Sequence, residues 1–125
     1  FAFLSYTNAV LESGVKIILE ETKLESFIKN ADFVITGEGR LDGQTVMGKA
    51  PIGVAEIAKK NKKKVLAFGG CVAEDATLCN QHGIDAFFPI LRTVTTLKEA
   101  MDFNHAKENL SAAVEQVFRL IQSFE

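Results

Sequence analysis

The feature that most constrains the fold of this sequence is a short apolar run, followed by a glycine-rich polar segment and then by a helix signal. The apolar run, Phe33–Thr36, is short and rich in β-branched residues, as expected of a buried strand. Pro51 stands where a helix can begin, because the first helical turn has no partner for the missing N–H. Ile52, Ala55 and Ala58 then recur at helical spacing. Open α/β sheets bind ligands where such strands end, so this segment predicts a site there.

The alternation of strand and helix signals continues along the chain. Two further strands are expected at 65–68 and 84–89, and a helix over 51–61 precedes the first of them. A helix over 75–82 separates the two strands, and Gly83 follows it as a helix-stop signal. This pattern predicts one α/β domain over the whole chain. Its parallel sheet has at least three strands, with helices on both faces and right-handed crossovers, as in Rossmann-like and flavodoxin-like layered architectures.

Helical signals also flank this core. Before it, a helix is expected over 7–21, followed by a second apolar helical face over 21–30. After it, Thr95 or Thr96 caps a short helix. A final amphipathic helix is expected over 105–124.

Composition excludes several classes of function. The chain has 125 residues, 47% of them hydrophobic, and a formal net charge of -2, so it has no basic footprint for nucleic acid. No apolar run approaches the ~20 residues of a membrane span, and no basic region precedes the apolar start at Phe1, so neither a membrane segment nor a signal peptide is expected. Cys71 and Cys79 have no metal-ligand spacing and are interpreted as reduced thiols of a cytoplasmic protein.

A resemblance to a known family adds to these observations. The segment VITGEGRLDGQTVMGKAPIGVAEIAKK, residues 34–60, resembles the most characteristic motif of the bacterial glycerate kinase family, which phosphorylates glycerate with ATP. The similarity runs from about Ala9 to the C-terminus, through KKVLAFGG, GIDAFFPI and TLKEAM in the order of the family. The chain resembles only the C-terminal third of that family. The resemblance therefore implies a fragment of a larger two-domain enzyme, with the N-terminal part as its missing partner.

The resemblance also implies a chemistry, in which the γ-phosphoryl group of ATP is transferred to a hydroxyl of glycerate with the help of Mg²⁺. This transfer requires positive charge around the phosphates and a carboxylate that orients or deprotonates the attacking hydroxyl. Asp42 is the first candidate for that carboxylate, as base or metal-linked anchor, and Glu38 is the second. Arg40 and Lys49 are candidates for holding phosphate or the carboxylate of glycerate. The further candidate binding residues are glycines and polar residues of the same segments: Gly37, Gly39, Gln44, Thr45, Gly69 and Gly70.

Each assignment has a plainer alternative. Arg40 paired with Glu38 or Asp42 would simply fix a turn, and Thr45 would be a helix cap. Cys71 stands where the family more often has a serine, so only a backbone contact is expected there. No metal ligand is assigned. The alternative function is an α/β ligand-binding or interaction module without catalytic turnover of its own.

Two geometric expectations complete the sequence-based account. Four charged side chains should converge on one cleft beside Gly69 and Gly70: Glu38, Arg40, Asp42 and Lys49. An apolar surface should mark the contact with the missing N-terminal part of the enzyme, with Phe1, Phe3 and Leu4 as its expected members. Whether the protein forms a homo-oligomer stays open.

Overall fold

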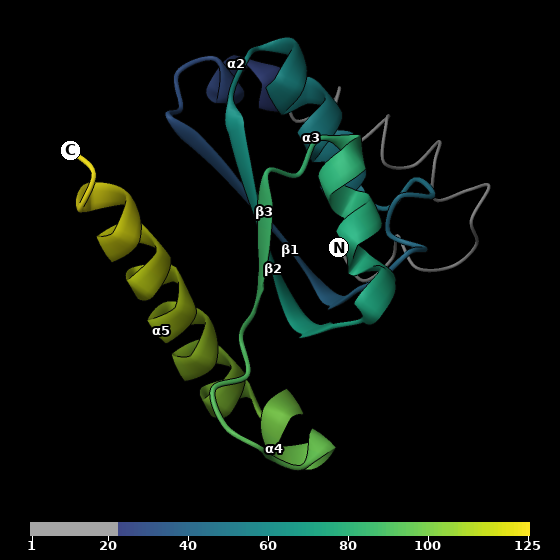
Figure 1. Ribbon diagram of the computed structural model, residues 1–125, viewed down its shortest axis with the longest axis vertical. Coiled ribbons are helices and arrows are strands. Elements are labelled where there is room, and N and C mark those ends of the chain that lie inside the picture. The colour runs from purple at the N-terminus through teal and green to yellow at the C-terminus, as the bar shows by residue number, and fades with distance from the viewer. Residues whose placement is uncertain (1–22) are drawn as a thin grey trace.

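Three parallel strands form the centre of the structure, a computed structural model that describes residues 23–125 (Figure 1). The strands β1 (Phe33–Leu41), β2 (Lys64–Val72) and β3 (Ala86–Pro89) lie in the order β1-β2-β3. Val34 of β1 lies opposite Val65 of β2 in the register. The predicted parallel sheet of at least three strands is confirmed.

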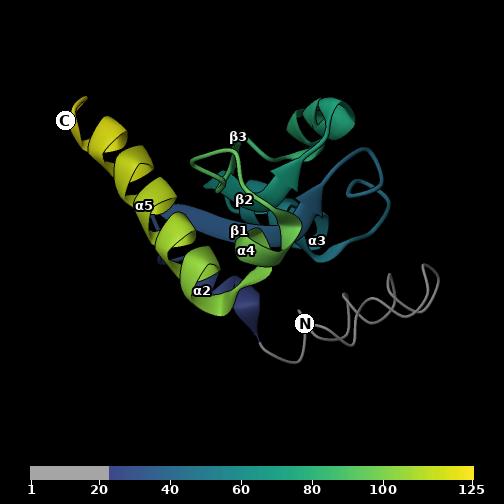
Figure 2. The same cartoon turned by 90° about the horizontal axis from the view of Figure 1, so that it is seen from below.

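Helices cover both faces of this sheet (Figures 1 and 2). One face carries α2 (Leu24–Ile28), α3 (Ala50–Lys60) and the 3₁₀ helix η2 (Glu74–His82). The opposite face carries the long helix α5 (Phe103–Gln122), which follows the short α4 (Leu97–Met101) and runs in the direction opposite to the strands.

Each face of the sheet has its own apolar core. On the α3 face the buried side chains come from both crossover helices and from alternate positions of the strands, and include Val34, Val65, Ala67, Ile52, Ala55, Ala58, Ala76, Cys79 and Ile84. On the α5 face, Val117 packs against Leu66 and Phe68. The Phe33 ring meets the Phe118 ring edge to face, with centroids 5.8 Å apart, so α5 reaches across the sheet to β1.

The first two strands are longer than the sequence pattern predicts. The expected boundaries at Thr36 and Phe68 are wrong, because β1 continues to Leu41 and β2 to Val72. The glycines of both strands continue the ladder, with Glu38 opposite Gly69. The GEGRL segment is therefore strand, and the loop begins only at Asp42.

The other boundaries differ less. Helix α3 covers nearly the predicted 51–61, and the 75–82 segment is a 3₁₀ helix rather than an α-helix. Gly83 has φ 99°, a left-handed conformation that favours glycine after a helix. Helix α5 begins earlier than predicted, because the Asp102 carboxylate accepts from the His105 N–H and caps it. The side chain of Thr96 caps α4 as expected, accepting from the Glu99 N–H at 3.2 Å.

Some expectations fall outside the described residues, namely the helix over 7–21 and the exposed apolar residues Phe1, Phe3 and Leu4. Across 23–125, no helix has both the length and the apolar character to cross a membrane. Cys71 and Cys79 are both free thiols.

Candidate functional site

A groove lies over the middle of β1 and β2, where the first half of α5 passes over the sheet. Its volume is about 520 Å³. Residues of both strands, the segment after β3 and α5 line it: Ile35, Thr36, Gly37, Glu38, Gly39, Phe68, Gly69, Gly70, Ile90 and Leu110. Among these lining residues, Glu38 carries the only charged side chain. We call this groove the glycine groove.

The glycines of the groove serve different purposes. A Cβ added to Gly70 would lie 2.6 Å from the backbone oxygen of Gly39, and one added to Gly69 would lie 2.9 Å from that of Cys71. These two glycines are required because the backbone passes too close for any side chain. A Cβ added to Gly39 meets nothing within 4 Å among the described residues, and its φ is outside the left-handed region. Packing therefore leaves open space above Gly39, where a ligand can approach the backbone.

A hydrogen-bonded turn, Asp42–Thr45, follows β1. The Asp42 carboxylate accepts from the Arg40 Nε at 3.1 Å and from the Gln44 backbone N–H at 2.9 Å, one bond to each oxygen. The Asp42 N–H donates to the Thr45 Oγ1 at 3.1 Å, and the Thr45 N–H donates to the Asp42 carbonyl oxygen at 3.1 Å. Thr45 is fully buried. We call these residues, with Arg40, the Asp42 turn.

The charges around Asp42 favour its ionised form. Burial on its own would raise the pKa of this carboxyl group. The hydrogen bonds from the Gln44 N–H and Arg40, together with the nearby charges of Lys49 and Arg40, outweigh burial, so the pKa of Asp42 lies below its ordinary value. An ionised carboxylate whose two oxygens are both engaged is suited to holding a turn.

The structure divides the residues that the sequence singled out. Five of them line the glycine groove: Gly37, Glu38, Gly39, Gly69 and Gly70. The others lie in or after the Asp42 turn: Arg40, Asp42, Gln44, Thr45 and Lys49. Lys49 directly precedes α3, after Gly48 with φ 92°. The four charged residues were expected to converge on one cleft. Among the described residues they do not, because only Glu38 of the four lines the groove.

Two lining residues of the groove escaped the sequence-based reasoning. Ile90 follows β3, and Leu110 belongs to α5. The amphipathic pattern of the last helix predicts a packing face but not the point at which that helix crosses the strands. Asp75 was missed as well; its carboxylate lies against Gly43, where a Cβ would collide with it.

The groove fits the ligands of a phosphoryl transfer in part. Among residues 23–125, no group of three His, Cys, Asp or Glu side chains could hold a metal by itself. Mg²⁺ at nucleotide sites is usually held by one or two carboxylates together with phosphate oxygens and water, so the single carboxylate of Glu38 is compatible with it. The open backbone at Gly39 is compatible with close approach of a phosphate.

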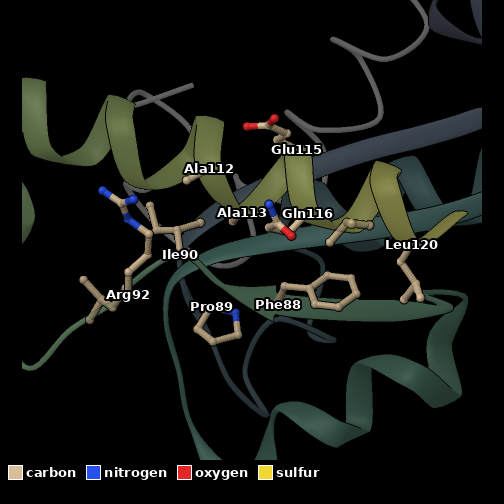
Figure 3. Close-up of a pocket in the computed structure, with 11 residues that line it drawn as sticks. Phe88, Pro89, Ile90, Arg92, Ala112, Ala113, Glu115, Gln116 and Leu120 are labelled. Atoms are coloured by element: carbon tan, nitrogen blue, oxygen red, sulfur yellow. The ribbon is translucent and has the colours of Figure 1, made fainter. Parts of the chain in front are cut away.

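A second groove lies between the end of β3 and α5 (Figure 3). It has a volume of about 630 Å³ and is lined mostly by apolar atoms, including those of Phe88, Pro89 and Leu120. Arg92 lies at one end, where its Nε donates to the Asn109 Oδ1 at 3.1 Å. This groove is the larger of the two, but it contains none of the predicted site residues. The glycine groove contains five of them and is therefore the candidate site.

Comparisons with known proteins agree with the sequence motif. The glycerate kinase family matches residues 1–122. A glycerate 2-kinase from Escherichia coli (strain K12) is 43% identical over 90% of this chain, and a glycerate kinase from Haemophilus influenzae is 42% identical over 89% of it. The chain spans 29% of the length of each of these relatives.

A solved structure described as a glycerate kinase 2 from Salmonella typhimurium LT2 superposes with a TM-score of 0.64 and 36% identity. The superposition covers 88% of this chain and 26% of that one. The fold and the motif thus lead to the same group of proteins, and the chain belongs to the glycerate kinase family.

Proposed function

We propose that this chain forms part of an enzyme that transfers the γ-phosphoryl group of ATP to a hydroxyl of glycerate and releases phosphoglycerate and ADP. Membership of the glycerate kinase family supports the reaction. The observation that carries the proposal for this chain is the glycine groove, where Glu38 is the one charged residue of the lining and the space at Gly39 is open.

In this proposal Glu38 is the catalytic carboxylate of the chain. It orients the attacking hydroxyl and accepts its proton as the new oxygen–phosphorus bond forms and the bond between the γ-phosphorus and the departing ADP oxygen breaks. ATP supplies the phosphoryl group, and the charge on its phosphates would be neutralised by Mg²⁺ when it is bound. The bound anion can approach the backbone at Gly39, because a Cβ built there would meet nothing within 4 Å among the described residues.

The Asp42 turn has a supporting role in the same proposal. Asp42 is less available than Glu38, because both of its oxygens already accept hydrogen bonds. Arg40 engages Asp42 through Nε, and its side chain is 63% exposed, so its terminal N–H groups can bind an anionic substrate. Lys49 stands beside the same turn and adds positive charge. Gln44 and Thr45 fix the backbone through their hydrogen bonds to Asp42.

The chain by itself is proposed to bind ligand without turnover. The matched part of the chain covers 29% of each of these two relatives, so much of the ATP site would lie in a further portion of polypeptide. We place the enzyme in the cytoplasm, because the two cysteines of this chain are free and disulfides are rare in that compartment.

A chimaera tests the proposal. In the glycerate 2-kinase of Escherichia coli, the matched segment is replaced by this chain, and ADP release is measured with ATP and glycerate. The chimaera should turn over, and the chain alone should not. Glu38→Gln in the chimaera should lower turnover roughly 10²–10⁴-fold, as expected for loss of a general base. The control is Glu56→Gln, which removes an exposed carboxylate of α3. A folded chimaera with normal turnover after Glu38→Gln would contradict the assignment.

A further inference from the structure

The 3₁₀ helix η2 is unusually long, at nine residues. Runs of more than about three or four residues are uncommon in 3₁₀ helices, because their hydrogen bonds have poor geometry. Helix η2 is held instead by its surroundings, since Ala76 and Cys79 are fully buried in the core. At its N-cap, the Ala73 N–H donates to the Leu41 carbonyl oxygen at 2.9 Å. The helix therefore begins beside the end of β1, next to the Asp42 turn.

Asp75 of η2 occupies the space that a side chain at Gly43 would need. A Cβ added to Gly43 would collide with the Asp75 carboxylate and would lie 3.3 Å from the Leu78 Cδ1. The φ of Gly43 is outside the left-handed region, so its backbone conformation does not call for glycine. The absence of a side chain at Gly43 therefore serves to admit the Asp75 carboxylate.

The thiol of Cys79 contacts the same turn from the core. Its Sγ donates to the Asp42 carbonyl oxygen at 3.9 Å, a weak hydrogen bond. Burial raises the pKa of the Cys79 thiol, and the carboxylates of Asp42 and Asp75 act in the same direction, against a hydrogen bond with Thr45. The thiol therefore stays protonated and able to donate. Helix η2 thus contacts two successive residues of the turn, from its exposed and its buried side.

We propose that Asp75 is a positioning residue: with Cys79 below, it holds the Asp42 turn so that the Arg40 guanidinium keeps its place. The Arg40 Nε donates to the Asp42 Oδ2 at 3.1 Å, so a shift of the turn moves the carboxylate to which the guanidinium is bonded. The inference rests on the proposed function only in the role of Arg40 as the group that binds the anionic substrate. The contact between η2 and the turn does not depend on that role.

The Nε–H proton of Arg40 tests the positioning without substrate. In the chain, this proton should exchange slowly with water, because the N–H is bonded to Asp42. Asp75→Ala should make its exchange, measured by NMR, about tenfold faster. Glu74→Ala is the control, since it removes the neighbouring exposed carboxylate of η2, and should leave the exchange unchanged. Parent-like exchange in Asp75→Ala would overturn the proposal.

Gly43→Ala tests the same contact from the other side. Its Cβ would meet the far end of a flexible side chain, so the Asp75 carboxylate should be displaced at little cost in stability. Exchange of the Arg40 Nε–H should become faster, as in Asp75→Ala. The double variant should exceed neither single variant, because both remove one contact. A Gly43→Ala variant with parent-like exchange would contradict the proposal.

Steady-state kinetics of the chimaera give a second readout. Asp75→Ala should raise the KM for glycerate roughly tenfold and change kcat little, because a displaced binding group weakens substrate binding. In a chimaera that also carries Arg40→Ala, Asp75→Ala should have no further effect, because the group that it positions is gone. Additive effects of the two substitutions would overturn the proposal, since a purely structural role does not depend on Arg40.

The two readouts separate this inference from the proposed function. If Arg40→Ala alone leaves the KM for glycerate unchanged, the substrate-binding role of Arg40 is wrong, and exchange of its Nε–H still decides whether Asp75 positions the guanidinium. If Arg40→Ala raises the KM while Asp75→Ala changes neither the exchange nor the KM, the role of Arg40 stands and the positioning role of Asp75 is overturned.

Discussion

The glycine groove and the Asp42 turn come from one motif, yet their carboxylates lie in opposite situations. Glu38 is one of the lining residues of the glycine groove, whose other members are glycines, apolar residues and Thr36. Asp42, four residues later, has both oxygens engaged by Arg40 and by the Gln44 N–H. The motif therefore contains one carboxylate residue in the lining of the groove and one carboxylate that holds a turn. A list of charged residues in a conspicuous motif does not distinguish the two.

The largest effect on stability is expected at the floor of the groove. Gly70→Ala should lower the free energy of unfolding by roughly 2–3 kcal/mol, because its Cβ would meet the backbone oxygen of Gly39 and the strands would have to move. Gly39→Ala is the matched control and should leave stability almost unchanged, since open space surrounds its Cβ. Urea unfolding of the two variants measures both effects. Equal losses would show that the groove is not open at Gly39.

A smaller loss is expected in the Asp42 turn. Thr45→Val keeps the shape of a fully buried side chain and removes the Oγ1 that accepts from the Asp42 N–H. The unpaired N–H should cost about 1–2 kcal/mol of stability. Thr77→Val, at an exposed position of η2, controls for the change of residue type. Thermal and urea unfolding measure both losses of stability. Equal losses for the two variants would show that the hydrogen bond of the turn does not stabilise the fold.

The smallest effect is a dependence of stability on pH. The pKa of Asp42 lies below its ordinary value of 3.8, because the bonds and charges around it outweigh burial. For Asp85, burial likewise opposes the shift, but the Lys59 ammonium and the Val65 N–H lower its pKa below the same value. The folded state therefore binds fewer protons than the unfolded state near pH 4. The stabilisation from both groups is complete above that pH and is lost as the pH falls below it.

The free energy of unfolding, measured between pH 5 and pH 3, tests whether stability falls with falling pH. The parent chain should lose stability over this range, and Asp42→Asn should lose less of it, by on the order of 1 kcal/mol. An Asp42→Asn variant with the same acid dependence as the parent would show that the Asp42 turn contributes no stability through its charge.

Sequence reasoning predicted the parts of the fold that depend on local patterns. The parallel sheet, helix α3 and the stop at Gly83 follow from apolar spacing and helix-end signals. The ends of β1 and β2 do not, because glycine weakens a strand in isolation. Here the glycines of each strand pair with non-glycine residues of the other, as Gly37 pairs with Phe68 and Gly69 pairs with Glu38. That match between distant segments is invisible to local patterns.

The functional site itself stays a prediction. A strand followed by glycines and charges indicated a site at the carboxyl edge of the sheet, whereas the glycine groove is lined by residues within β1 and β2. Which carboxylate stays available depends on the hydrogen bonds that close the Asp42 turn. Whether Leu110 lines the groove depends on where α5 crosses the strands, and that crossing point is set by tertiary packing.

The most direct test of the central claim compares turnover of the Glu38→Gln and Asp42→Asn chimaeras, with unfolding measured on the same samples. If the glycine groove carries the chemistry, Glu38→Gln should lose roughly 10²–10⁴-fold in kcat with normal stability, and Asp42→Asn should lose less than about tenfold while unfolding more easily. The opposite ranking, with Asp42→Asn folded normally but inactive and Glu38→Gln fully active, would contradict the claim and move the chemistry to the Asp42 turn.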